Sequence, residues 1–322
     1  MAKKGCLGFS MPVAIGITVI LLGLLAVGLL FGPLGQSFIG NMELPEWVEN
    51  WIVIEKPHPE LPAETVFHLL GIKVTNSMIA TWITIVFLVG FSYIVTRRMK
   101  LVPGRLQAAF EFIVGWLYDL CCSVAGEKNG RRFFPIVATI FLMVGFNAWL
   151  GLIPGYGSIL AHTAEGEVHL LRAANTDLNT PLALAVVSFI FVEITALRGL
   201  GLGYLKKFFP VGEFWNSLKK VFKGNAKAGL SGMFTGFIFI FTGLLELLSE
   251  FIRIISLSFR LFGNMTAGEI LLMVVAFVVP WVFAVPFYGL ELLIGFIQAL
   301  IFAGLTLIYV TVAVTPHEEE AH

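Results

Sequence analysis

Cysteine is scarce in this sequence, and histidine is both scarce and scattered. Only three of the 322 residues are cysteines, Cys6, Cys121 and Cys122, and they give neither a disulfide framework nor a metal-ligand spacing. The six histidines lie away from the centres of the apolar runs, and none has a partner at metal-ligand spacing. We therefore expect no metal site and no cofactor.

Charged residues are also few, at 13% of the chain, whereas hydrophobic residues make up 57%. A soluble domain carries roughly 25% charged residues and about 45–50% apolar ones. Uncharged runs near the length that crosses a bilayer, about 20 residues, recur at 5–42, 74–96, 133–164, 178–192 (shorter), 270–290 and 292–316. The alternation typical of membrane β-barrel strands is absent. The sequence thus predicts an all-α membrane protein.

The basic residues are divided unequally between the predicted loops. If Lys3 and Lys4 stay in the cytoplasm, sixteen of the 21 Lys and Arg residues fall in inside segments and three, Lys56, Lys73 and Arg172, fall outside. The remaining two lie within apolar sequence. An excess of inside positive charge is the usual pattern in membrane proteins, and it sets the expected orientation.

Four predicted spans alternate in direction, at about residues 12–32, 75–96, 133–153 and 179–197. The first is longer than the core of a signal peptide, about 7–15 residues, so we favour a retained helix over a cleaved signal.

Two inside segments separate these spans from one another and from the last third. Residues 101–130 open with Pro103–Gly104 and carry apolar residues at helical spacing. They predict an amphipathic cytoplasmic helix, lying on the membrane or packed on a neighbouring helix. Residues 206–227 form a basic loop suited to an anionic leaflet, not to a nucleic acid.

The last third contains an unusually long helical pattern. Residues 229–279 contain no proline. As one helix they would span about 75 Å, against a hydrocarbon core of about 30 Å. The run either breaks into two spans or forms one strongly tilted helix. Pro280 and Pro286 bracket a turn before a final run to Pro316. Charge counting leaves the side of the C-terminus open.

Charged residues interrupt this apolar region at Glu246, Glu250, Arg253, Arg260, Glu269 and Glu291. Charges at membrane depth are costly, so they normally face water or one another. Glu246, Arg253 and Arg260 are seven residues apart and fall on one helical stripe. Glu250 and Arg253 are three apart and able to pair. For Glu246, Glu250 and Arg253, a structural ion-pair set and a functional role are equally supported.

Arg260 differs because no carboxylate lies within four positions of it. Arginine keeps its charge when poorly hydrated, so another helix or subunit must supply an anion. Asn264 lies one turn on, on the same face. Glu269 falls on the opposite side of the helix and is expected to serve a different compartment or interface. Glu291 and Gln298 share a face of the last helix. Glu269 and Glu291, one on each of two antiparallel helices, suit a proton relay, because a partly buried carboxylate can gain and lose a proton near physiological pH.

Several motifs in this region are specific. Residues 256–269, Ser-Leu-Ser-Phe-Arg-Leu-Phe-Gly-Asn-Met-Thr-Ala-Gly-Glu, resemble the signature of subunit a of F-type ATP synthases. Residues 298–302, Gln-Ala-Leu-Ile-Phe, resemble its last-helix motif, and residues 101–107, 150–155 and 177–180 match in order. The resemblance covers roughly residues 55–317.

The resemblance implies a non-catalytic channel and stator subunit. Arg260 would face the rotating c-subunit ring between two aqueous half-channels, with b-type peripheral stalk subunits as further partners. Glu269 and Glu291 would form the outer relay, and Glu246 would be the cytoplasmic carboxylate.

Asn264 and Gln298 would line the region around the arginine, and Arg253, Glu250 and Ser256 are secondary candidates. The ion would be H⁺, with Na⁺ not excluded, and the expected location is a bacterial plasma membrane or an organelle inner membrane.

The resemblance also implies a tilted C-terminal helical hairpin with the C-terminus inside. We therefore expect about four transmembrane helices plus this hairpin. The expected divisions are an extra N-terminal helix and acidic outside segment (1–54), spans with cytoplasmic segments (55–228) and the hairpin with the ion pathway (229–322). Ile254 stands where many relatives have proline, and Glu291 stands where some have histidine.

Two other classes compete with this interpretation. A secondary transporter usually shows internal repeats with interrupted helices in both halves, whereas here the buried charges lie in the last third alone. A proton-pumping subunit of a respiratory complex would be expected to centre on buried lysines and glutamates. No lysine lies inside any apolar run of this sequence.

Overall fold

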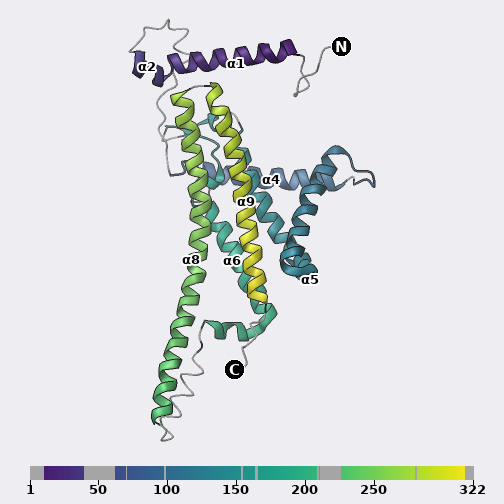
Figure 1. Cartoon of the computed structure of the whole chain (residues 1–322), viewed down its shortest axis with the longest axis vertical. Coiled ribbons are helices and arrows are strands. Elements are labelled where there is room, and N and C mark those ends of the chain that lie inside the picture. The colour runs from purple at the N-terminus through teal and green to yellow at the C-terminus, as the bar shows by residue number, and fades with distance from the viewer. Residues whose placement is uncertain are drawn as a thin grey trace.

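A computed structural model describes residues 11–39, 62–69, 71–97, 99–153, 155–163, 166–208, 210, 226–279 and 281–315. The described chain is mostly helical (Figure 1), and six of its helices are long and apolar enough to cross a membrane. They are α1 (Met11–Phe31), α4 (Asn76–Arg97), α5 (Arg105–Gly151), α6 (Asn179–Leu200), α8 (Ala226–Val278) and α9 (Val285–Val314). The prediction of an all-α membrane protein is confirmed. Much of the acidic outside segment (40–61), most of the basic loop (211–225) and the acidic tail after 315 lie outside the described residues.

α5 contains two predicted elements in succession. The predicted amphipathic helix and the third span follow one another, separated by Gly126, whose φ of 76° and ψ of 160° are not helical. Glycine takes this conformation readily because it has no Cβ. The first arm buries Leu117 against the core but leaves Leu106 and Phe112 exposed. The expectation that this arm packs on a neighbouring helix is therefore confirmed for one face, and its contact with the membrane stays a prediction.

α8 and α9 form the long C-terminal hairpin (Figure 1). α8 is one helix of 53 residues, about 80 Å long, so of the two expected forms the unbroken helix is correct. The short 3₁₀ segment η4 (Trp281–Ala284) turns the chain into α9. Gly199, at the end of α6, packs against Val314 at the end of α9. The ends of α6 and α9 therefore lie on the same side of the molecule, and α9 ends inside if the orientation predicted from the basic residues holds.

Two short antiparallel hairpins were not predicted. β1 (Thr65–Leu69) pairs with β2 (Ile72–Thr75), and β3 (Leu160–Thr163) pairs with β4 (Gly166–His169). Both lie in predicted outside segments. With the 3₁₀ turns η1 (Tyr156–Ser158) and η2 (Ala174–Thr176), they cap the outer ends of the spans. The 3₁₀ helix η3 (Gly201–Lys207) directly follows the C-terminal end of α6, which is predicted to lie inside.

The N-terminal helix lies apart from the main bundle. Figure 1 shows α1 across the end of the α8–α9 hairpin, not alongside it, and the short helix α2 (Pro33–Ile39) follows. α1 contacts η4 and is almost entirely exposed.

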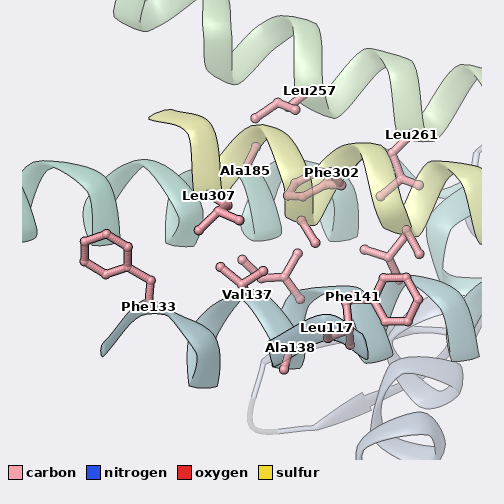
Figure 2. Close-up of a cluster of buried hydrophobic side chains, with 14 of the residues drawn as sticks. Leu117, Phe133, Val137, Ala138, Phe141, Ala185, Leu257, Leu261, Phe302 and Leu307 are labelled. Carbon is pink, nitrogen blue, oxygen red and sulfur yellow. The ribbon is translucent and has the colours of Figure 1, made fainter. Parts of the chain in front are cut away.

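The core lies where α5, α6, α8 and α9 meet (Figure 2). Phe133, Val137 and Phe141 of α5 face Phe302 and Leu307 of α9. Fully buried alanines on α9, at 299 and 303, let the helices approach closely. α8 contributes Leu257 and Leu261, which lie four residues apart on one face. This packing fixes the rotation of α8 about its axis, and therefore the direction of its charged side chains.

Candidate functional site

Arg260 lies on the face of α8 that the rest of the chain leaves uncovered. Its neighbour Leu261 is buried in the core, and one residue along a helix turns the side chain by about 100°. Arg260 is consequently exposed, and the large residues around it on this face, Ile255, Phe259 and Leu271, are exposed too. The face also contains the smaller residues Ser256, Gly263 and Ala267. It is an apolar strip with one cation near its middle.

The guanidinium of Arg260 has no carboxylate partner among the residues that the structure describes. This fits the expectation that its anion comes from elsewhere. Asn264, one turn further on, is half-buried at the edge of the same face. Gln298 is buried on α9, one turn before Phe302, which packs in the cluster containing Leu261.

Glu269 is turned away from Arg260, as its nine-residue spacing predicts. Its Oε2 lies 3.3 Å from Nη2 of Arg172, which reaches it from the loop between β4 and η2. Arg260 and Glu269 are about 13 Å apart along the helix axis. The structure therefore does not bring these two charges together.

Glu291 and Glu269 lie at one helix–helix contact. The carboxylate of Glu291, which is only 4% exposed, lies directly against Gly268, where a Cβ would collide with it. Since Gly268 adjoins Glu269, the two carboxylates come from facing helices at the same level of the hairpin. The relay role of Glu269 and Glu291 remains a prediction, and this contact places residues from the two helices side by side.

A second group of polar residues lies toward the cytoplasmic end of the hairpin. Arg253 pairs with Glu250 at 2.6 Å, and its guanidinium lies 3.9 Å from the ring centre of Tyr309. The hydroxyl of Tyr204 donates to Glu193 at 3.2 Å. Burial, followed by the charge of Glu193, raises the pKa of the Tyr204 phenol above its usual value, so it stays a hydrogen-bond donor. The i,i+3 pairing of Glu250 with Arg253 is confirmed.

Two further carboxylates, Glu193 and Glu246, lie in this region. Glu193 of α6 accepts its hydrogen bond from Tyr204 of η3. Glu246 is half-buried on α8, about 21 Å along the axis from Arg260. Arg253 contacts Tyr309 of α9, whereas Arg260 is exposed. The residues spaced by seven along α8 therefore lie in two different environments.

Sequence reasoning missed several functional candidates near the outer end. Arg172 was counted as an ordinary loop cation, yet its side chain is only 12% exposed. Asn147 and Asn175 are buried; Asn147 accepts from Thr84 at 2.6 Å, and Asn175 donates to a backbone carbonyl of α5. For Asn147 the sequence did contain a signal, because a polar asparagine lies there inside the apolar run 133–164.

Comparison with known proteins was decisive for the family. The family profile described as ATP synthase A chain matches residues 78–311. The chain is 35% identical to ATP synthase subunit a of Gloeobacter violaceus, over 76% of this chain and 85% of that one. It is also 30% identical to the subunit a of Geotalea daltonii, over 79% of this chain and 96% of that protein. The chain belongs to the ATP synthase subunit a family.

Membership in the subunit a family makes the chain a component of the membrane sector (Fo) of a rotary ATP synthase, and a proton-transport protein. It removes the secondary-transporter and respiratory-complex alternatives. With bacterial relatives and six apolar helices, the chain is a multi-pass membrane protein of the bacterial type.

Proposed function

We propose that Arg260 is the fixed charge that couples ion translocation to rotation of a c-subunit ring. One observation carries the proposal. A charged, exposed guanidinium lies on an uncovered apolar strip of α8, with no carboxylate partner in the described part of the chain. An unpaired charge on a membrane-facing surface is expensive, so a partner subunit must bring an anion to it.

The physical mechanism follows from the cost of burying charge. A ring carboxylate facing lipid must be neutral, because its ionised form is prohibitively costly there. Opposite Arg260 the ionised form is favoured, so deprotonation depends on position. The same fixed charge blocks direct passage of protons between the two half-channels. The membrane potential supplies about 2.3 kcal/mol per charge per 100 mV.

In this proposal the hairpin contributes both half-channels. Glu269 and Glu291 pass the proton on the outer side, and Glu246 does so on the cytoplasmic side. Asn264 and Gln298 line the region around Arg260, while Ser256, Glu250 and Arg253 act in support. The chain performs no bond chemistry itself, and b-type stalk subunits hold it against the turning ring.

Disulfide trapping tests whether the uncovered face of α8 meets the ring. We expect Ser256→Cys, which is exposed one turn from Arg260, to cross-link with a cysteine placed one turn from the ring carboxylate. The matched control is Ser258→Cys, since Ser258 is fully buried on the other side of the same helix. Native cysteines are first replaced by serine. Cross-linking at neither position, or equally at both, would contradict the proposed interface.

A further inference from the structure

Arg172 links the outer loops to the C-terminal hairpin. Its Nη2 lies 3.3 Å from Oε2 of Glu269, and its Nη1 donates to the backbone oxygen of Pro62 at 3.3 Å. Its Nε is buried and has no hydrogen-bond partner within the described residues. Burying an arginine that far is costly unless it is paired. Glu269 supplies the opposite charge.

The loop that presents Arg172 is held on both sides. Asp177, five residues later, accepts a hydrogen bond from the Ser77 hydroxyl at 2.6 Å. Three residues earlier, the backbone of His169 donates to Glu64 at 2.8 Å, and its carbonyl accepts from Asn76. The guanidinium is therefore placed by a hydrogen-bonded outer cap, not by a free loop.

We propose that Arg172 is a positioning residue of the outer half-channel. Its guanidinium holds the Glu269 carboxylate at the level where Gly268 and Glu291 meet. This inference rests on the proposed relay role of Glu269. Planar guanidinium groups fix the orientation of a carboxylate better than ammonium groups do, because their donors form a rigid fork.

The other ionisable groups near this contact lie on three neighbouring elements. Glu291 comes from α9, Glu64 precedes β1 and His169 ends β4. Glu64 and His169 bond to each other through the His169 backbone N–H, and the His169 ring contacts the carbonyl oxygen of Gly157 at 2.6 Å. Within the described residues, Arg172 is the cation that pairs with Glu269.

A charge series at position 172 tests the proposal. Passive proton conduction is measured in membrane vesicles stripped of the catalytic head, per assembled complex. We expect Arg172→Lys to keep at least half of the wild-type rate, Arg172→Gln to lose about tenfold, and Arg172→Glu to lose more. Lys73→Gln, at an exposed cation of β2, is the matched control and should conduct normally. Equal rates in all Arg172 variants, or a Lys variant as damaged as the Glu variant, would overturn it.

Chemical restoration makes the test independent of folding. Arg172→Cys is assembled and then treated with a methanethiosulfonate reagent carrying an aminoethyl group, or with its neutral methyl counterpart, with the wild type treated in parallel. Recovery by the aminoethyl reagent alone supports a charge-based role. Recovery by both reagents or by neither contradicts it.

Glu269→Gln separates this inference from the proposed function. If Glu269→Gln conducts normally, the relay itself is wrong. If Glu269→Gln abolishes conduction while Arg172→Gln conducts normally, the relay stands and only the positioning role is wrong.

Discussion

Arg172 and Arg260 carry the same charge in opposite surroundings. Arg172 is nearly buried and paired within the chain, whereas Arg260 is exposed and has no carboxylate partner in the described residues. A paired arginine is satisfied and can hold another group in place. An unpaired one on an apolar surface must be satisfied by another molecule. This difference in partners, not in residue type, is why we propose a positioning role for Arg172 and a coupling role for Arg260.

We predict that a substitution at Gly268 lowers proton conduction more than it lowers assembly of the complex. In Gly268→Ala, the added methyl group displaces the flexible Glu291 carboxylate, so conduction should fall about tenfold, or about 1.4 kcal/mol, while assembly is retained. Shortening the displaced side chain with Glu291→Asp should restore part of the rate. Conduction in stripped vesicles is the measurement.

Gly289→Ala is the matched control on the facing helix, because a Cβ at Gly289 meets no atom within 4 Å. It should conduct like the wild type. A normal rate of proton conduction in Gly268→Ala would show that conduction does not depend on the present position of the Glu291 carboxylate.

Relations between residues of the same helix could be predicted from the sequence, because their spacing sets which face each side chain occupies. The isolation of Arg260, the pairing of Glu250 with Arg253 and the opposite facing of Glu269 all follow from helical spacing. Arg172 could not be found in this way. Its partner lies 97 positions away, and only the outer cap brings the two together.

At the scale of elements, Gly126 sets the angle between the two arms of α5. Its φ of 76° with ψ of 160° is nearly restricted to glycine, so Gly126→Ala should destabilise the subunit by about 1–3 kcal/mol. Gly115→Ala, in the helical first arm, is the matched control. It should stabilise by about 0.5–1 kcal/mol, because alanine is the better helix former and a Cβ there meets no atom within 4 Å. Thermal unfolding in detergent measures both, and the same sign for both would contradict this account of the kink.

The long helices were predictable because apolar length is a strong signal, whereas the outer hairpins were not. Each of their strands has four or five residues. A short strand carries little periodicity, and the turn glycine, Gly71 with φ of 83°, is a weak local cue on its own. These hairpins nevertheless matter, because they hold the loop that carries Arg172.

At the scale of the whole molecule, the uncovered face of α8 is the surface that we propose meets the ring of the ATP synthase. α6 and α9 cover the opposite face, where Leu257 and Leu261 are buried. A 53-residue helix exposing a long apolar strip offers a large surface to another membrane subunit.

The central claim is that Arg260 couples translocation to rotation, and Arg260→Ala tests it most directly. Vesicles bearing the intact complex are assayed for ATP-driven acidification, and stripped vesicles for passive leak. Arg198→Ala, an exposed arginine near the end of α6, is the matched control. We predict that Arg260→Ala assembles, loses driven pumping and leaks more protons, while Arg198→Ala pumps normally. Pumping near the wild-type rate in Arg260→Ala would contradict the account and leave Arg260 a structural residue.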